Sequence, residues 1–189
     1  SHTPASGDYG KGADQTTLKR RVPREWLLDY MRAGIDCIAV TDHNTGAWVD
    51  RVRTMLGELE REQPKGFKPI HVFPGIEISV NGGIHVLAIF DPSKTTSDLD
   101  ALLGAVEYQG TPRQSNGVTR KSFVEVVSTV TSTGGIAIPA HVDENNGLFQ
   151  LTGTTVQQVL HCKDIFAMEL MNTTYKKPQS YLDKKLSWT

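Results

Sequence analysis

The chain has 189 residues, of which 38% are hydrophobic and 22% charged, and its formal net charge is −1. This length suits one domain with a sizeable core and is too short for two comfortable ones. The near-neutral charge excludes the strong overall basic field of many nucleic-acid-binding proteins, although a local basic cluster could still serve that role.

The cysteine content indicates a reducing compartment. Cys37 and Cys162 form no CxxC motif and are too few for a disulfide framework. No apolar run approaches the roughly 18–20 residues of a membrane span, and the N-terminal residues lack the apolar core of a signal peptide. We therefore expect a soluble, cytoplasmic protein without a membrane partner.

The first half of the chain predicts helices alternating with strands. Residues 1–19 are small and polar without a period, which predicts a loop. A helix is predicted between Pro23 and Gly34, which suit its two ends. A buried strand follows over 35–40, then a helix over 48–62, an extended segment over 69–79, a turn over 81–83 and an apolar strand over 84–90.

The second half continues this alternation. Helices are predicted over 99–106 and 123–130, a polar loop over 109–119, a strand over 135–140, a short helix over 156–161, a strand over 165–171 and a last helix over 179–186. The order predicts an α/β fold with a mostly parallel sheet, open or closed into a barrel. In such folds the chemistry lies at the carboxyl ends of the strands.

Polar side chains stand where several apolar strands end. Asp42 and His43 directly follow the strand over 35–40, and burying them without partners would cost several kcal/mol. The pattern recurs at Glu77, His85 and His141, which predicts a metal site. Neighbouring strand residues point to opposite faces, so we assign His43 to the metal and Asp42 to orienting a ligand imidazole. The alternative is that Asp42 caps a following helix.

The Glu77 and His85 pair gives a geometric condition for this site. If residues 81–83 form a three-residue hairpin loop, Ser79 faces His85, and Glu77 becomes its diagonal neighbour on the same face, roughly 7–8 Å away between backbones. A two-residue loop would place His85 opposite Ile78 and send Glu77 to the other face. The alternative role for His85 is a hydrogen-bonded core imidazole.

The remaining histidines are interpreted individually. A lone histidine such as His141 after a buried strand is more often structural, but three other ligands at strand ends favour metal binding. His71 begins a strand, and His161 ends a helix where a cation suits the helix dipole. We interpret both of these as structural.

Five segments in order resemble the PHP family, the polymerase and histidinol phosphatase phosphoesterases. They are His2–Ser6, Ala39–Asn44, Phe73–Ser79, Ile84–Leu87 and Ile138–His141. Together they cover most of the chain, which is more specific than any one of them. The opening is most similar to PHP modules at the N-terminus of SMC/AAA-like ATPases, some of them linked to DNA repair or phage defence.

The resemblance implies a distorted (β/α)₇ TIM-like barrel with two or three divalent metal ions at its carboxyl rim. The implied ligands are His2, Asp8, His43, Glu77, His85 and His141, with Glu77 bridging two ions. Asn172 falls where the family often has a polar rim residue. The ligand types suit zinc, manganese or iron without choosing among them.

Two family motifs are missing. The first histidine of an opening His-x-His would precede Ser1, and a closing Gly-x-Asp-x-His motif is absent. The barrel therefore looks clipped at both ends. We expect residues 1–189 to be a single PHP-like domain of a longer chain, which could also carry an ATPase domain.

The expected function is hydrolysis of a phosphate ester by a metal-bridged hydroxide, with Asp42 assisting the leaving oxygen. The most favoured substrate is a nucleic-acid phosphodiester, DNA or RNA. The alternatives are a small phosphomonoester, a non-catalytic docking module of a larger ATPase, or a metal-free domain with Glu77 and His85 on opposite faces.

Basic residues near the expected site are candidates for holding phosphate. Arg113 and Arg120 are assigned to substrate binding together with Asn172. Further candidates are Lys11, Lys19, Arg20, Arg21 and Lys121. For each of these basic residues alone, a solvated basic face is the better interpretation.

Overall fold

The computed structural model describes residues 1–10 and 15–182. Its centre is a four-stranded sheet in the order β1-β2-β3-β6. These strands are β1 (Cys37–Val40), β2 (His71–Ser79), β3 (His85–Ile89) and β6 (Ile136–Pro139). A separate two-stranded hairpin pairs β4 (Tyr108–Gln109) with β5 (Val118–Thr119).

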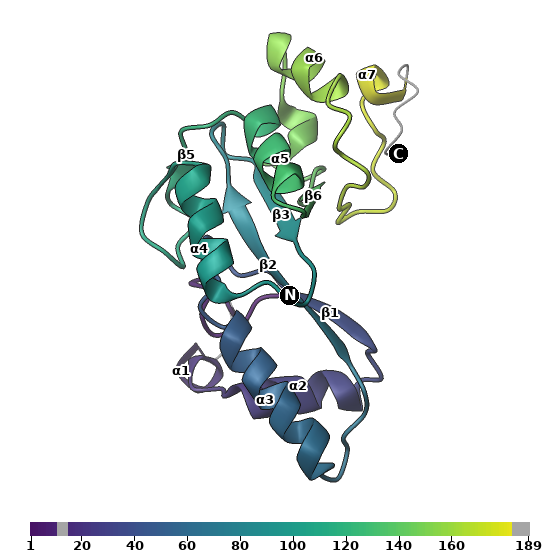
Figure 1. The fold of residues 1–189 in the computed structure, drawn as a ribbon. Helices are drawn as coiled ribbons and strands as arrows, with labels where there is room; N and C mark the ends of the chain where they lie inside the picture. The colour runs from purple at the N-terminus through teal and green to yellow at the C-terminus, as the bar shows by residue number, and fades with distance from the viewer. Residues whose placement is uncertain (11–14, 183–189) are drawn as a thin grey trace.

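The helices pack mainly on one face of the sheet. They are α1 (Gln15–Lys19), α2 (Pro23–Arg32), α3 (Val49–Glu62), α4 (Thr96–Ala105), α5 (Phe123–Ser132), α6 (Thr154–Leu160) and α7 (Gln179–Leu182), with a 3-10 turn at Leu148–Gln150. Helices α2 and α3 contact each other, and α4 contacts α5 (Figure 1). No helix in the described ranges is long and apolar enough to cross a membrane.

Alternation along the strands decides which side chains enter the core and which face the site. In β1 and β3, every second residue is buried, including Val40 and Val86. Their neighbours Ala39 and Leu87 are less buried and line a cavity on the opposite face. This period of two places one face against the helices and leaves the other for chemistry.

The α/β class is confirmed, but the prediction of a mostly parallel sheet is wrong. Only β1 and β2 are parallel, whereas β3 runs antiparallel to both β2 and β6. The tight turn after Ser79 reverses the chain at once and leaves no room for the crossover that a parallel pair needs. Strands β1 and β6 are the two edge strands of the sheet, so the sheet is not closed into a barrel within residues 1–10 and 15–182.

Several element boundaries also differ from the predictions. Residues 15–19, expected in a loop, form α1, and the loop over 109–119 is closed at its ends by β4 and β5. Helix α4 begins at Thr96 rather than residue 99 because Thr95 and Asp98 form a capping box. The strand expected over 165–171 is reduced to a bridge between Ile165 and Ala137. The last helix is α7, and positions 183–186 of its predicted span lie outside the described residues.

Candidate metal centre

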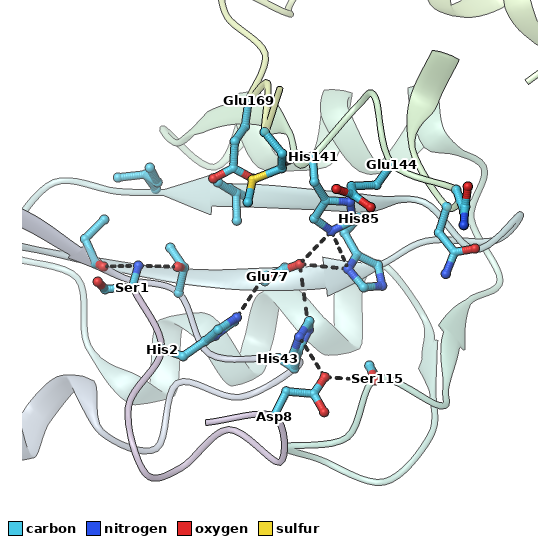
Figure 2. Close-up of a pocket in the computed structure, with 17 residues that line it drawn as sticks. Ser1, His2, Asp8, His43, Glu77, His85, Ser115, His141, Glu144 and Glu169 are labelled. Atoms are coloured by element: carbon cyan, nitrogen blue, oxygen red, sulfur yellow. Dashed lines mark hydrogen bonds and ion pairs between the residues drawn. The ribbon is translucent and has the colours of Figure 1, made fainter. Parts of the chain in front are cut away.

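Glu77 lies at the centre of a cluster of four imidazoles. Its Oε1 atom is 2.7 Å from His85 Nδ1, 3.4 Å from His141 Nε2 and 3.8 Å from His43 Nδ1. Its Oε2 atom is 3.4 Å from His2 Nε2. Figure 2 shows His2 and His43 on one side of the carboxylate and His85 and His141 on another. The buried carboxylate of Glu77, on β2, therefore contacts side chains from four other segments of the chain.

These side chains form two overlapping groups that could hold a metal ion. The first contains His2, His43 and Glu77, and the second contains Glu77, His85 and His141. In each group one ligand atom per residue lies within 4.8 Å of the others. Glu77 belongs to both groups, which is the position that the PHP resemblance implied for it.

An unpaired nitrogen and the spacing of the cluster fit a metal better than a hydrogen-bond network. The Nδ1 atom of His43, which faces Glu77 Oε1 at 3.8 Å, is buried and has no hydrogen-bond partner, although buried polar atoms are normally paired. The gaps from Glu77 to His2, 3.4 Å, and to His43, 3.8 Å, are long for hydrogen bonds, and the hydrogen bond with His141 is a long one at 3.4 Å. They suit ligands of a common ion, which bind at about 2.0–2.2 Å each. The donor set thus fits zinc, manganese or iron.

The pKa shifts of Glu77, His2 and His43 also favour metal binding, whereas that of His141 favours the protonated imidazole, which a metal would have to deprotonate. Burial lowers the pKa of His2 and of His43, which favours the neutral imidazole that coordinates metal. Burial alone would raise the pKa of Glu77, but hydrogen bonds from His141 and His85 outweigh it and hold that pKa below its ordinary value. The hydrogen bond to Glu77 raises the pKa of His141. Glu77 is therefore an anion.

The three-residue hairpin register is confirmed. Ser79 pairs with His85 in the β2–β3 ladder, and Val80 N donates to Ile84 O. Glu77 and His85 consequently share a face. The antiparallel direction of β3 matters here because it brings the first residue of that strand to the rim where β1, β2 and β6 end. The metal-free alternative required these two side chains on opposite faces, which the structure contradicts.

Asp42 lies behind the cavity rather than in it. It has no exposed surface, and its two oxygens accept 2.5 Å hydrogen bonds from Thr3 N and Thr3 Oγ1. Burial raises its pKa to about 6 despite these bonds. This position does not suit the proton-donating role predicted for Asp42, because Asp42 is not among the residues that line the cavity. It instead fixes the opening segment so that His2, 4.0 Å from Asp42 Oδ1, enters the site.

Asp8 approaches the centre from the opening segment. Its Oδ2 atom is 3.3 Å from His43 Nε2 and accepts a hydrogen bond from Ser115 Oγ. Both Asp8 and Ser115 line the cavity (Figure 2). All six predicted metal ligands are therefore found around this one cavity, which has a volume of about 740 Å³.

Asn44 is a structural residue that sequence analysis missed. It is fully buried with φ 48°, and its Oδ1 accepts a hydrogen bond from Ser79 N. Its Nδ2 donates to Ser79 Oγ and to Gln114 O, each at 2.9 Å. Asn44 thus connects the turn after His43 with the end of β2 and with the loop over 110–117. A tolerance of asparagine for positive φ was the only signal for this in the sequence.

The predicted substrate-binding residues lie outside the cavity lining. Arg113 and Arg120 are exposed on the β4–β5 hairpin, and Arg113 is close enough to lower the pKa of Asp42 electrostatically. The Asn172 side chain accepts hydrogen bonds from Thr174 N and Oγ1, which turns it towards its own loop. The other basic candidates are also absent from the lining, and Lys11 lies outside the described residues.

Further polar residues line the cavity, and the other two histidines lie away from it. Glu144, Asn145, Asn146 and Glu169 line the rim near His141 and were not predicted. Only the polar run 143–146 in the sequence indicated this side. His161 Nδ1 donates to Gln157 O, and His71 is exposed at the start of β2. Neither of these two histidines lines the cavity.

Comparison with known proteins shows similarity at the level of the fold. No family model and no curated protein matches the chain. A solved structure from Bifidobacterium adolescentis, provisionally described as a metal-dependent phosphoesterase, superposes with a TM-score of 0.55 and 16% identity, covering 89% of this chain and 74% of that one. An amidohydrolase from Chromobacterium violaceum, with bound sulfate and no metal, gives a TM-score of 0.47 and 16% identity over 84% of this chain and 69% of that one. The chain shares the fold of the first structure.

Proposed function

We propose that the protein is a metal-dependent phosphoesterase of the PHP type that hydrolyses a nucleic-acid phosphodiester. The observation that carries the proposal is the pair of ligand groups sharing the Glu77 carboxylate. The fold shared with a structure described as a phosphoesterase supports it, as do the five PHP-like sequence segments.

The residues of the centre have distinct parts in this proposal. His2, His43 and Glu77 would hold one divalent ion, and Glu77, His85 and His141 a second, with Asp8 beside His43 as a further ligand. Such ions make bound water acidic and neutralise charge on phosphoryl oxygens. Asp42 and Thr3 hold His2 in place, and Asn44 holds the turn that carries His43.

Two features support a phosphodiester as the substrate. The cavity of about 740 Å³ is larger than a single phosphate group requires. Arg113 and Arg120 are exposed on the hairpin whose Ser115 lines the cavity, so they are placed to attract a polyanionic backbone. We further propose an ATPase as a partner of this domain, because the opening segment resembles PHP modules of SMC/AAA-like ATPases.

The proposal is tested by comparing substrates on the complete protein with Mn²⁺ or Zn²⁺. We expect cleavage of single-stranded DNA or RNA, abolished by chelation and by His141→Ala. Faster turnover of an aryl phosphomonoester than of any nucleic acid would indicate the small-molecule alternative. Metal binding without cleavage of either substrate would refute the enzymatic proposal and favour the docking module.

A further inference from the structure

Two side-chain carboxylates accept hydrogen bonds that connect the segment carrying His141 with the segment over 169–172. Glu169 Oε2 accepts a 3.0 Å hydrogen bond from the backbone N–H of His141. In the opposite direction, Asp143 accepts hydrogen bonds from Met171 N at 2.9 Å and Asn172 N at 2.7 Å. We call Glu169 and Asp143 with these three amides the carboxylate clamp.

Backbone hydrogen bonds connect the same two segments. Glu169 N donates to Pro139 O, and Val142 N donates to Glu169 O, each at 2.9 Å. The expected strand over 165–171 is thus only a short stretch beside the end of β6, and side-chain carboxylates replace the regular ladder beyond it. Hydrogen bonds to ionised acceptors are stronger than neutral ones, so these contacts can fix a loop that has little sheet pairing.

His141 has a backbone conformation that needs such support. Its φ is 32°, in the left-handed region that L-residues other than glycine, asparagine and aspartate seldom adopt, at a cost of order 1–3 kcal/mol. This turn follows directly after β6 and directs the imidazole to Glu77, at 3.4 Å, and to His85, at 3.1 Å. Figure 2 shows Glu169 beside His141 at the rim of the cavity.

We propose that Glu169 is a positioning residue for the second ligand group, because its carboxylate binds the His141 amide and holds the imidazole toward Glu77 and His85. The inference rests on the proposed function, since it concerns how the chain arranges itself for the metal. Glu169 acts through the backbone of His141 and is not itself assigned as a ligand. Asp143 supports the same turn from the other segment.

Zn²⁺ titration of the folded protein, followed by calorimetry, tests the metal part of this proposal. Partners of metal ligands typically change affinity by 10–100-fold when removed, so we expect Glu169→Ala to weaken one class of Zn²⁺ site by about that factor. Glu169→Gln retains an acceptor oxygen for the His141 amide and should restore most of the affinity. Glu60→Ala, on the exposed surface of α3, is the matched control and should bind as the wild type does.

The clamp can also be tested in the metal-free protein. Amide hydrogen exchange followed by NMR should show the His141 amide protected in the wild type and exchanging at least about tenfold faster in Glu169→Ala. The Ala140 amide, which donates to His85 O, is the internal reference and should change little. If Glu169→Ala does not fold, Asp143→Ala removes the opposite half of the clamp; it should speed exchange of the Met171 and Asn172 amides and weaken the same class of Zn²⁺ site.

The possible failures are distinguishable. A wild-type protein that binds no Zn²⁺ refutes the proposed function and the positioning role with it. Wild-type binding that Glu169→Ala retains, whether or not its melting temperature falls, refutes the positioning role alone. Equal exchange of the His141 amide in both proteins shows that the clamp does not hold this turn, and this also overturns the inference.

Discussion

Ser79 and His85 face each other across the β2–β3 hairpin, and this pairing decides that Glu77 and His85 point to the same side of the sheet. The distance between His85 Nδ1 and Glu77 Oε1, 2.7 Å, follows from it. The pairing depends on the three residues between Val80 and Ile84, where Gly83 N donates to Val80 O. The pairing register of the hairpin therefore controls whether the second ligand group can form.

Deletion of Ile84, the first residue after the loop, should remove His85 from the site. With the three-residue loop kept, His85 would then lie opposite Val80 instead of Ser79, which turns it to the opposite face. We expect Zn²⁺ affinity in calorimetric titration to fall as far as it does in His85→Ala. Asn81→Ser, an exposed change that keeps the loop length, is the control. Wild-type affinity in the deletion variant would show that the register does not govern the site.

Substitution of Glu77 should affect both ligand groups, whereas substitution of a histidine should affect one. We expect Glu77→Gln to lose metal at both groups, with affinity reduced more than roughly 100-fold, since removal of partners outside the ligand set already costs 10–100-fold. His2→Ala and His141→Ala should each lower the bound metal, measured by mass spectrometry of the metal content, by one group only. Equal loss in all three variants would contradict two groups with a shared carboxylate.

Removal of Asn44 should release the loop over 110–117. Asn44→Ala deletes the hydrogen bonds to Ser79 and to Gln114 O and leaves an alanine at φ 48°. We expect the free energy of unfolding in urea to fall by about 2–4 kcal/mol. Limited trypsin digestion should cleave faster after Arg113, the residue before the lost tether.

Two further variants separate the contributions at this position. Ser79→Ala removes the Ser79 Oγ acceptor but keeps the tether to Gln114, so its tryptic rate after Arg113 should stay near that of the wild type. Asn44→Gly relieves the strain of positive φ and should be less destabilising than Asn44→Ala. Unchanged digestion in Asn44→Ala would show that the tether does not hold the loop.

Tyr181 should make the protein sensitive to alkali. Burial raises the pKa of its hydroxyl from 10.0 to about 12, and the ring packs on Phe149. The folded state therefore keeps the proton between pH 10 and 12 while the unfolded state loses it, so stability falls as the pH rises through this window, by up to about 3 kcal/mol.

Chemical denaturation at pH 9 and at pH 11.5 checks this expectation. Tyr181→Phe keeps the packing and removes the ionisable group, so the variant should gain stability relative to the wild type as the pH rises. A constant difference between the two proteins at both pH values would show that the Tyr181 hydroxyl ionises equally in the folded and unfolded states.

The local parts of the centre could be predicted from the amino-acid sequence. Strand alternation and the spacing of residues 77–85 reduced the arrangement of Glu77 and His85 to two hairpin registers, because side-chain direction alternates along each strand. The structure has the register with the three-residue loop. The positions of His43 and His141 after apolar strands indicated that they meet at one rim. Such features depend on residues close together in the chain, so the alternation of side chains along a strand is enough to predict them.

The contacts that hold those ligands in place join segments far apart in the sequence and could not be predicted from it. Thr3 binds Asp42 across 39 residues, Asn44 binds Gln114 across 70 and His141 binds Glu169 across 28. Such hydrogen bonds join single polar residues in segments with no periodic pattern, so only their placement in space reveals the partners. The predicted hairpin already implied that β3 runs antiparallel to β2, but the antiparallel pairing of β3 with β6, from a distant segment, appears only in the tertiary structure.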